Sequence, residues 1–387
     1  MKFIDELDIA GKRVFLRADL SVPLEAGKVA DDHRIRATIP TIEYALKKGA
    51  SVILCSHLDR PKGRDMKYSL APVADRLREL LKAEVALAPD CVGEEIERLS
   101  KVLRPGEVLL LENVRFHAEE EANDPAFAEQ LSKLGDVYVN DAFATAHRKH
   151  ASTAGITKFF SVKGGGFTMK DELSYFHRAF NDPKRPLVAI FGGAKVSTKM
   201  AAIRAVGERA DKVLIGGAMA NTFFAAAGYN VGKSLFEPEE VDNARDIQSK
   251  MGSAKLLLPT DVVVASELKS GIPTKTVAVT EIPAEQMALD VGPQTVAQFR
   301  EAIRGAATIL WNGPMGAFET EEFASGTYAI VDALSESEAL TVVGGGDTDL
   351  ALHRRHAFEK MSYVSTAGGA FLKLLEGGSL AAVKALE

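Results

Sequence analysis

Basic and polar side chains follow the apolar runs in the first half of the chain. The set comprises Arg17, Asp19, Ser21, Arg34, His57, Arg60, Arg115 and Arg148. Arginine presents paired donors that fit carboxylate and phosphate groups. Gathered at one place, these residues would form a pocket for a small, highly anionic molecule. The alternative is that each arginine is solvated or pairs with a nearby carboxylate, in a chain with 53 acidic and 47 basic residues.

Glycine-rich turns follow the apolar runs in the second half, at 192–193, 216–218, 344–348 and 366–369. Glycine lets the backbone approach a phosphate closely, and the free N–H groups at a helix start favour negative charge. One such turn is weak evidence, because tight packing between helices and strands also uses glycine. Four in one half favour a phosphate-binding site.

Two lysines and one aspartate add charge to these turns. Lys195 and Lys199 are four residues apart, which would place them on one face of a helix. There they could hold the charge of a transferring phosphate, or they could form a solvated surface. Asp347 could hold Mg²⁺ against phosphates, or it could cap the helix that follows.

The elements that must position these residues are predicted to be short strands alternating with helices. Strands are expected at 13–16, 51–55, 108–111, 136–140, 187–191, 212–215, 255–258, 308–311, 341–343 and 362–365. This alternation is typical of βαβ units around a mostly parallel sheet, in which ligands bind at the carboxyl ends of the strands. The glycines at 164–166 and a helical pattern at 167–180 predict a hinge between two α/β halves. The alternative is an ordinary loop and helix within one domain.

Length and composition limit the protein class. At 387 residues and 41.6 kDa, about 150 residues per domain makes two domains the first expectation. An apolar fraction of 46% excludes disorder, and a net charge of −6 argues against a generally basic nucleic-acid binder. The two cysteines exclude a disulfide framework and an all-cysteine zinc site, and Cys55 is expected to be a buried thiol. With no signal-peptide pattern and no apolar run of about 18 residues, a cytoplasmic protein without a membrane partner is expected.

Several common motifs are absent. The sequence Gly232-Lys233-Ser234 resembles the end of a P-loop, but Ala227 stands where the first glycine is required. No G-x-G-x-x-G, H-E-x-x-H or G-x-S-x-G occurs, which argues against a standard dinucleotide fold, a zinc peptidase and an α/β-hydrolase. The remaining features favour phosphoryl transfer between a nucleotide and a small acid.

At these residues the sequence closely resembles the phosphoglycerate kinases. The motifs are RADLSVP (17–23), DDHRIRA (31–37), SHLDRPKG (56–63), LLENVRF (110–116), NDAFATAHR (140–148), GGAKVSTK (192–199), GGAMANTF (216–223), WNGPMGAFE (311–319), GGGDT (344–348) and STAGGA (365–370). The resemblance implies an α/β fold of two Rossmann-like, doubly wound, mostly parallel domains joined by a hinge helix. The expected division is a phosphoglycerate-binding domain at 1–166 with the tail 370–387, a hinge helix at 167–185 and a nucleotide-binding domain at 186–369.

The resemblance also implies a reaction. In glycolysis and gluconeogenesis, the family reversibly transfers the acyl phosphate of 1,3-bisphosphoglycerate to ADP, giving 3-phosphoglycerate and ATP, with Mg²⁺ and as a monomer. Transfer would be direct and in line, because the acceptor oxygen is already ionised and needs no general base. His57 is then expected to bind substrate rather than to move protons, and domain closure is expected to exclude water.

The resemblance also implies site residues at the positions that match the family's motifs. The resemblance implies a phosphoglycerate site of Asp19, Ser21, Arg34, His57, Arg60, Arg115 and Arg148. It implies nucleotide contacts from Gly193, Lys199, Gly217, Ala218, Asn312, Glu319, Gly345, Gly346, Asp347 and Thr348. Within this set, Glu319 would meet the ribose and Asp347 the metal. The catalytic groups around the transferring phosphoryl would be Arg34, Lys195, Lys199 and Gly368.

Three positions depart from the family pattern. Ser21 stands where the family usually has Asn, Asp59 where it has Gly, and Ala367 where it has Gly. Asp59 could repel an anionic substrate or pair with Arg60 or Arg64, and a positive φ there would be tolerated better by Asp than by most residues. Activity is expected to be retained. The alternatives are a binding protein of this fold without catalysis and a nicotinamide dehydrogenase.

Overall fold

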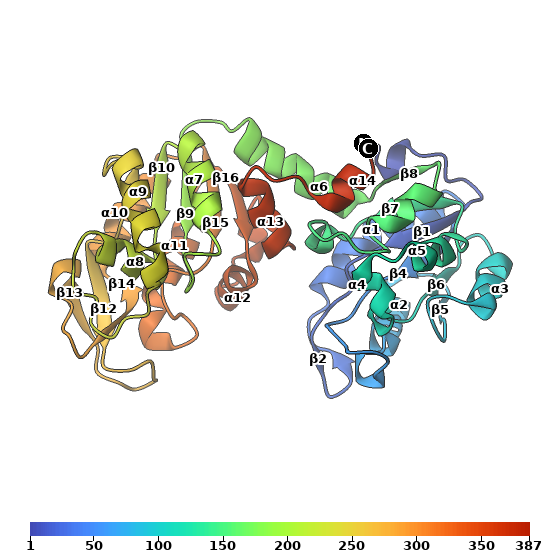
Figure 1. The fold of residues 1–387 in the computed structure, drawn as a ribbon, viewed down its shortest axis with the longest axis horizontal. Coiled ribbons are helices and arrows are strands. Elements are labelled where there is room, and N and C mark those ends of the chain that lie inside the picture. The colour runs from blue at the N-terminus through green and yellow to red at the C-terminus, as the bar shows by residue number, and fades with distance from the viewer. The chain divides into compact units, whose positions relative to one another are not determined.

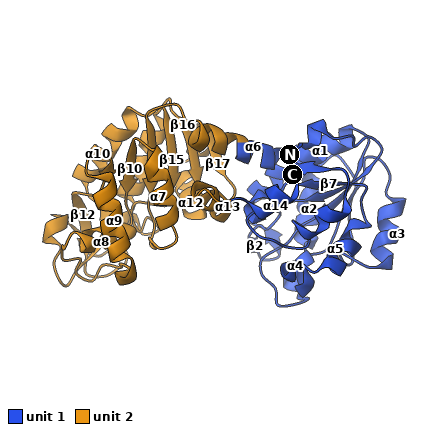
Figure 2. Cartoon of the chain, turned by 45° about the horizontal axis from the view of Figure 1, so that its top comes forward, with its two compact units in different colours: residues 1–173, 379–387 blue, residues 174–378 orange.

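The computed structural model describes all 387 residues, which form two compact units. Unit 1 contains residues 1–173 and 379–387, and unit 2 contains residues 174–378 (Figure 2). Helix α6 (Phe167–Phe176) and a π-turn at His177–Asn181 occupy the segment for which one continuous helix was expected. The functional roles assigned to the two domains, and the hinge, stay predictions.

Unit 1 is built on a six-stranded parallel sheet in the order β5-β6-β4-β1-β7-β8 (Figure 1). Its strands are β1 (Arg13–Arg17), β4 (Ser51–Cys55), β5 (Val85–Leu87), β6 (Val108–Leu110), β7 (Val137–Asn140) and β8 (Lys163–Gly165), with a small hairpin of β2 (Leu24–Glu25) and β3 (Lys28–Val29). Its helices are α1 (His33–Lys47), α2 (Ala71–Leu80), α3 (Glu94–Val102), α4 (Ala118–Ala122), α5 (Pro125–Ser132) and the C-terminal α14 (Ala381–Ala385).

Both faces of the unit 1 sheet are buried. On one face Val14 and Leu16 of β1 pack in a core with apolar residues of α1 and α2. On the other face Phe15 stacks on Tyr138, with ring centroids 6.1 Å apart. Burial on both faces explains why the strands read as continuous apolar runs, and Cys55 is a fully buried thiol as predicted.

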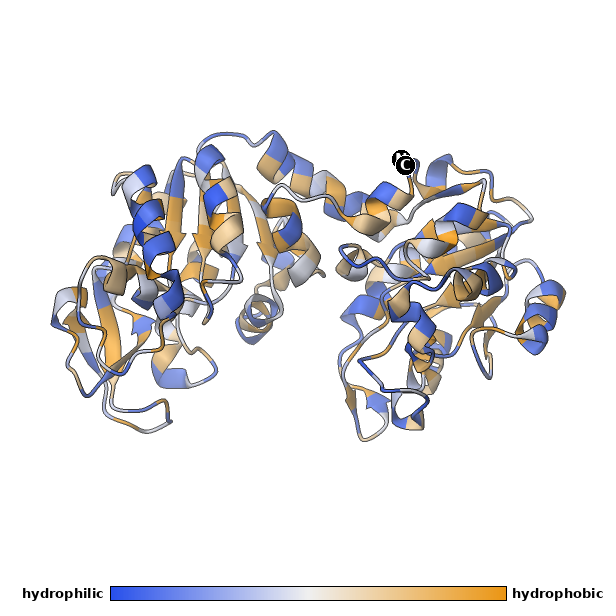
Figure 3. Cartoon of the chain, in the orientation of Figure 1, coloured by the Kyte–Doolittle hydropathy of each residue, from blue (hydrophilic) through white to orange (hydrophobic).

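Unit 2 repeats this plan with a parallel sheet in the order β11-β10-β9-β15-β16-β17. Its strands are β9 (Leu187–Phe191), β10 (Lys212–Ile215), β11 (Leu256–Leu257), β15 (Thr308–Asn312), β16 (Leu340–Gly344) and β17 (Tyr363–Ser365). Its helices are α7 (Met200–Arg209), α8 (Met219–Ala226), α9 (Val241–Met251), α10 (Pro293–Arg304), α11 (Ser325–Ser335), α12 (Gly346–Arg354) and α13 (Gly368–Leu375). Alternate residues of β9 enter two different cores, one on each face of the sheet. Figure 3 shows the apolar strands of both sheets between helices with polar outer surfaces.

Unit 2 contains a second sheet that was not predicted. Strands β12 (Asp261–Ala265), β13 (Lys275–Ala278) and β14 (Met287–Val291) form an antiparallel sheet in the order β13-β12-β14. The predicted α/β fold with mostly parallel sheets is otherwise confirmed. None of the helices is long and apolar enough to span a bilayer.

Candidate active site

The predicted acid-binding residues of unit 1 follow four neighbouring strands. Asp19 follows β1, His57 follows β4, Arg115 follows β6 and Arg148 follows β7, and these strands are adjacent in the order β6-β4-β1-β7. All four strands run parallel, so their carboxyl ends meet at one edge of the sheet. The sheet topology therefore brings these residues to one edge, as expected from the strands that they follow.

Arg34 lies in the first turn of α1 and pairs with Asp19. Its Nη1 is 3.0 Å from Asp19 Oδ2 and 3.2 Å from the Ser21 carbonyl oxygen. The Arg34 side chain is 39% exposed, which leaves donors of its guanidinium open to solvent. A carboxylate that orients an arginine while the rest of its fork stays accessible is suited to binding an anion.

The departure at Asp59 is built into this site. Its φ is +56°, so the position does require the left-handed region that glycine adopts most easily. Its N–H donates to Ser21 Oγ at 3.1 Å, and its carbonyl accepts a 2.6 Å hydrogen bond from Arg115 Nη1. The carboxylate accepts the Arg60 backbone N–H at 2.9 Å rather than pairing with a guanidinium. Arg64, the other suggested partner, pairs with Asp90 instead.

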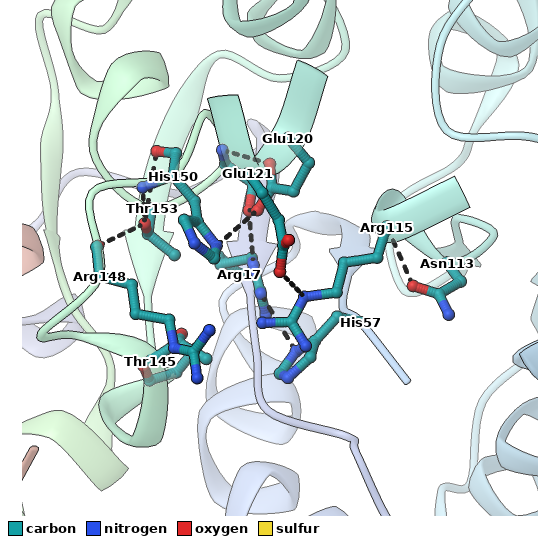
Figure 4. Close-up of polar contacts among 12 residues, drawn as sticks. Arg17, His57, Asn113, Arg115, Glu120, Glu121, Thr145, Arg148, His150 and Thr153 are labelled. Atoms are coloured by element: carbon teal, nitrogen blue, oxygen red, sulfur yellow. Dashed lines mark hydrogen bonds and ion pairs between the residues drawn. The ribbon is translucent and has the colours of Figure 1, made fainter. Parts of the chain in front are cut away.

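His57 is nearly buried beside arginines. Its Nδ1 lies 3.2 Å from Nη2 of Arg17, and Figure 4 shows the ring next to the guanidinium groups of Arg17 and Arg115. Burial, and then the positive charges of Arg17, Arg115 and Arg34, hold the pKa of His57 well below its usual range. His57 is therefore neutral at pH 7, which suits a hydrogen-bonding role.

Two arginines of the predicted set have no side-chain partner. Arg60 is exposed, and Arg148 is half-buried with a guanidinium that makes no hydrogen bond or ion pair (Figure 4). Arg115 is largely buried and has an ion pair of 3.3 Å with Glu121. The structure thus joins Asp19, Ser21 and Arg34 by direct hydrogen bonds. Arg115 is linked to Ser21 through the Asp59 backbone, and His57 contacts Arg17. The Arg60 side chain contacts none of the others.

The predicted nucleotide residues of unit 2 follow the strands of its sheet in the same way. Gly193 N–H donates to the Pro314 carbonyl, and Gly217 N–H donates to the Met315 carbonyl, each at 2.8 Å. A Cβ on Gly217, where φ is +66°, would lie 2.5 Å from the Gly193 nitrogen. These glycines are needed because three backbone segments approach each other where a side chain would not fit.

Lys199 closes this group of loops. Its Nζ donates to the Gly192 carbonyl at 2.6 Å and to the Asn312 carbonyl at 3.1 Å. Burial lowers the pKa of Lys199 to about 8, and the opposing effect of Asp347 is smaller.

The expectation that Lys195 and Lys199 share a helix face is wrong, because α7 begins only at Met200. The preceding turn is held instead by Ser197, whose N–H and hydroxyl both donate to Glu237. Lys195 is exposed and its ammonium has no partner.

The start of α12 offers free N–H groups and one carboxylate. Gly345, at φ +110°, is the N-cap residue, so Asp347 is not the helix cap that was considered as an alternative. The Asp347 side chain is exposed and has no partner. Thr348 is buried and accepts a 2.9 Å hydrogen bond from Gly313 N–H, while Asn312 Nδ2 donates to the Gly344 carbonyl at 2.8 Å.

The remaining predicted residues lie near these loops. A Cβ on Gly368, which begins α13, would lie 3.6 Å from the Gly345 Cα. The adjacent departure is harmless to the backbone, since Ala367 has φ −129°. Ala218 directly precedes α8, whereas Glu319 is exposed with a carboxylate that has no partner.

Some participating groups were not predicted. The backbone of 313–315 supplies the acceptors for two glycine turns, and Ser152 and Glu120 bond the buried Arg17 network. The motif WNGPMG was a signal for the first group. No sequence signal marked Ser152 or Glu120, because both act through tertiary contacts far from them in the chain.

Comparison with known proteins assigns the family. Residues 4–378 match the sequence model of the phosphoglycerate kinase family. The chain belongs to the phosphoglycerate kinase family. It is similar to the phosphoglycerate kinase of Geobacter metallireducens, at 53% identity with 100% of this chain and 98% of the relative covered. It is also similar to the cytosolic phosphoglycerate kinase of Triticum aestivum, at 51% identity with 99% and 97% covered.

Solved structures agree with this assignment. The phosphoglycerate kinase from Coxiella burnetii has a TM-score of 0.90 and 40% identity, and that from Pyrococcus horikoshii has a TM-score of 0.86 and 33% identity. Each alignment covers 100% of this chain and 98% of the solved chain. The resemblance and the enzyme class predicted from the sequence, a phosphotransferase, are confirmed.

Proposed function

We propose that this chain is a catalytically active phosphoglycerate kinase that moves the acyl phosphate of 1,3-bisphosphoglycerate to ADP, and back from ATP to 3-phosphoglycerate. The observation that supports this most strongly is the row of basic groups at the carboxyl ends of β6, β4, β1 and β7. Arg148 has no counter-ion, and the only counter-ion of Arg115 is Glu121, whose side chain is 53% exposed. A trianionic acid would supply the missing negative charge.

In unit 1, we assign the binding of the acid to the arginines and to His57. Arg115 and Arg148 would take the charged ends of the acid through paired donors, with Arg60 reaching in from its exposed position. Asp19, which already orients Arg34, has lone pairs available for a substrate hydroxyl. Ser21 would contribute less, because its hydroxyl is used by the Asp59 N–H.

In unit 2, we assign the nucleotide to the turns that follow the strands. The base is assigned to the surface beside the turns at Gly193, Gly217 and Ala218, and Glu319 offers a carboxylate for the ribose hydroxyls. The free N–H groups at the start of α12 would receive phosphate oxygens, since a helix N-terminus favours negative charge.

Asp347 fits a magnesium ion. Its carboxylate is exposed, unpartnered and next to the helix start assigned to phosphates, and Mg²⁺ is usually held by one or two carboxylates together with phosphate oxygens. When bound, the ion would offset the charge on the nucleotide phosphates.

The chemistry then needs positioning and charge stabilisation. Both the nucleotide phosphate and the carboxylate that can accept the phosphoryl group are ionised, so no residue has to remove a proton. Arg34 and the free ammonium of Lys195 would stabilise the transferring group, and the N–H groups near Gly368 would add neutral donors. Lys199 keeps the loops of the nucleotide site together while carrying a positive charge below pH 8. A monomer suffices for this chemistry, and a cytoplasmic location is proposed from the wheat relative.

A coupled assay tests the proposal. The chain is supplied with 3-phosphoglycerate, ATP and Mg²⁺, and glyceraldehyde-3-phosphate dehydrogenase with NADH reports on 1,3-bisphosphoglycerate. We expect loss of NADH that requires both substrates and the metal. Asp347→Ala should raise the Mg²⁺ concentration needed, whereas Asp332→Ala, which removes a half-buried carboxylate of α11 that pairs with Arg355, should not. ATP binding without turnover would refute the proposal and favour a binding protein.

A further inference from the structure

Arg17 is a charged residue with no solvent exposure, although it was not among the residues assigned to the substrate. It ends β1, and its guanidinium lies at the edge of the sheet where the acid is proposed to bind. Its Nη2 is 3.2 Å from His57 Nδ1 (Figure 4). A buried arginine is costly unless its donors are used, so its partners indicate its role.

The contact with Arg17 decides which nitrogen of His57 holds the proton. A guanidinium has only donors, so Nδ1 of the imidazole must accept and cannot carry a proton. A neutral His57 then carries its proton on Nε2. No hydrogen bond or ion pair in the structure involves Nε2, which leaves this N–H for a ligand oxygen.

The surroundings of His57 keep the ring neutral. The charged and titratable groups that act on it are Arg17 from β1, Arg34 from α1, Arg115 after β6, and His150. All are basic, and none of the hydrogen bonds or ion pairs in the structure joins a carboxylate to the ring. The carboxylates in this region are engaged elsewhere, since Glu121 pairs with Arg115.

Arg17 is itself held in place by a buried relay. Its Nε donates to Ser152 Oγ at 2.7 Å, and its Nη1 donates to the Ala18 carbonyl. Ser152 donates through its hydroxyl to Glu120 Oε1 at 2.6 Å and through its N–H to Oε2 at 2.8 Å. Glu120 is fully buried, and its carboxylate balances the positive charge of Arg17 through the Ser152 hydroxyl that lies between them. Both the position and the charge of the guanidinium are therefore fixed before any ligand arrives.

We propose that Arg17 is a positioning residue, anchored to Glu120 through Ser152, that fixes His57 as a neutral imidazole protonated on Nε2 and so makes it a hydrogen-bond donor to an oxygen of the bound acid. This inference rests on the proposed function for the identity of the acid. Under this proposal the two ring nitrogens of His57 have fixed roles, with Nδ1 as the acceptor and Nε2 as the donor. A ring with its acceptor nitrogen occupied by Arg17 and its other nitrogen protonated cannot remove a proton from a substrate.

The first test observes the wild-type protein directly. Long-range ¹H–¹⁵N NMR spectra of the His57 ring distinguish the two neutral tautomers from the protonated form. We expect the Nε2-protonated neutral form throughout pH 6–8. A proton on Nδ1, or a doubly protonated ring at pH 7, would overturn the proposal.

The second test separates positioning from folding. Arg17→Met should let His57 exchange between tautomers and titrate nearer its usual pH. It should also raise the KM for 3-phosphoglycerate about tenfold, the effect of one lost charge-assisted hydrogen bond, while the KM for ATP stays unchanged. The matched control is Arg13→Lys, which changes an arginine of the same strand that pairs with Asp136 at the surface. If Arg17→Met does not fold, Ser152→Ala loosens the same guanidinium and should give the same direction of change.

The outcomes distinguish this inference from the proposed function. A folded Arg17→Met protein whose KM for 3-phosphoglycerate is unchanged, or rises equally with that for ATP, would refute the role of Arg17. The NMR spectra need no turnover, so an inactive chain with the expected tautomer would refute the proposed function alone.

Discussion

Asp59 offers a test of how charge and backbone conformation each contribute to the acid-binding site. It stands at φ +56°, and its backbone and carboxylate contact Ser21, Arg60 and Arg115. Replacing it by glycine removes the charge but keeps the conformation accessible. Replacing it by alanine removes the same charge but leaves a Cβ in the left-handed region.

The electrostatic effect of Asp59→Gly can be worked from its exposure. Asp59 is exposed and borders a cavity of about 500 Å³, so the dielectric constant of water applies. A unit charge about 8 Å from a trianion repels it by ~1.6 kcal/mol in water. This separation is about one Debye length at physiological ionic strength, so screening by salt reduces the repulsion to ~0.6 kcal/mol. We therefore expect Asp59→Gly to lower the KM for 3-phosphoglycerate two- to threefold, on the order of that energy.

The conformational effect should oppose this gain in Asp59→Ala. A left-handed alanine costs about 1–2 kcal/mol, which favours a loop rearrangement that turns the carbonyl away from Arg115. The KM of Asp59→Ala should exceed that of Asp59→Gly by up to about tenfold. The assay is the coupled assay at 0.05 M and 0.5 M salt, with Asp75→Ala on the exposed face of α2 as the control. Equal KM values for the two variants would refute the argument from φ, and a KM unchanged by Asp59→Gly would refute the argument from repulsion.

Three further predictions concern unit 2. Lys195→Ala should lower turnover by on the order of 10²–10³, as for loss of one transition-state donor, and near-normal steady-state turnover would remove Lys195 from the catalytic set. At pH values above 8 the KM for ATP should increase, because the pKa of Lys199 is about 8 and its positive charge is lost as the pH rises. Lys199→Arg, which stays charged, should abolish this increase. A wild-type KM for ATP that does not change with pH would contradict the role assigned to Lys199. Gly313→Ala should weaken ADP binding in calorimetric titration, because the added Cβ would lie 2.4 Å from both the Gly192 carbonyl oxygen and Lys199 Nζ. The control is Gly305→Ala, whose Cβ would meet no atom within 4 Å and which should bind ADP normally.

Much of the fold could be predicted because the two main sheets are buried on both faces. Such strands are nearly continuous apolar runs, and the predicted strand at 187–191 agrees with β9 residue for residue. Ordering the polar residues by the strand they follow was enough to anticipate which of them meet at a sheet edge. In the small antiparallel sheet, β13 carries little apolar signal because three of its four residues are exposed, but β12, with the sequence DVVVA, is an apolar run that was missed.

The details of the site depended on contacts that no local pattern encodes. A spacing of four residues suggested a helix at Lys195 and Lys199, but Glu237 binds Ser197 from 40 positions away and holds a turn there. In the same way, the burial of Arg17 depends on Ser152, which lies 135 positions along the chain. The charged groups are visible in the sequence, whereas the pairs that they form depend on the fold.

The return of the chain to unit 1 after unit 2 has a consequence for the order in which the two units can be completed during synthesis. Residues 379–387 belong to unit 1, where Ala382 N–H donates to the Ala146 carbonyl and Leu380 and Leu386 are buried. During synthesis these residues emerge after all of unit 2, so unit 2 has its whole sequence available while unit 1 still lacks helix α14. A chain interrupted after residue 378 would therefore contain all of unit 2 attached to a unit 1 that lacks the buried side chains of Leu380 and Leu386. Ribosome-stalled chains of increasing length should accordingly gain protease resistance in unit 2 before unit 1 reaches its full resistance.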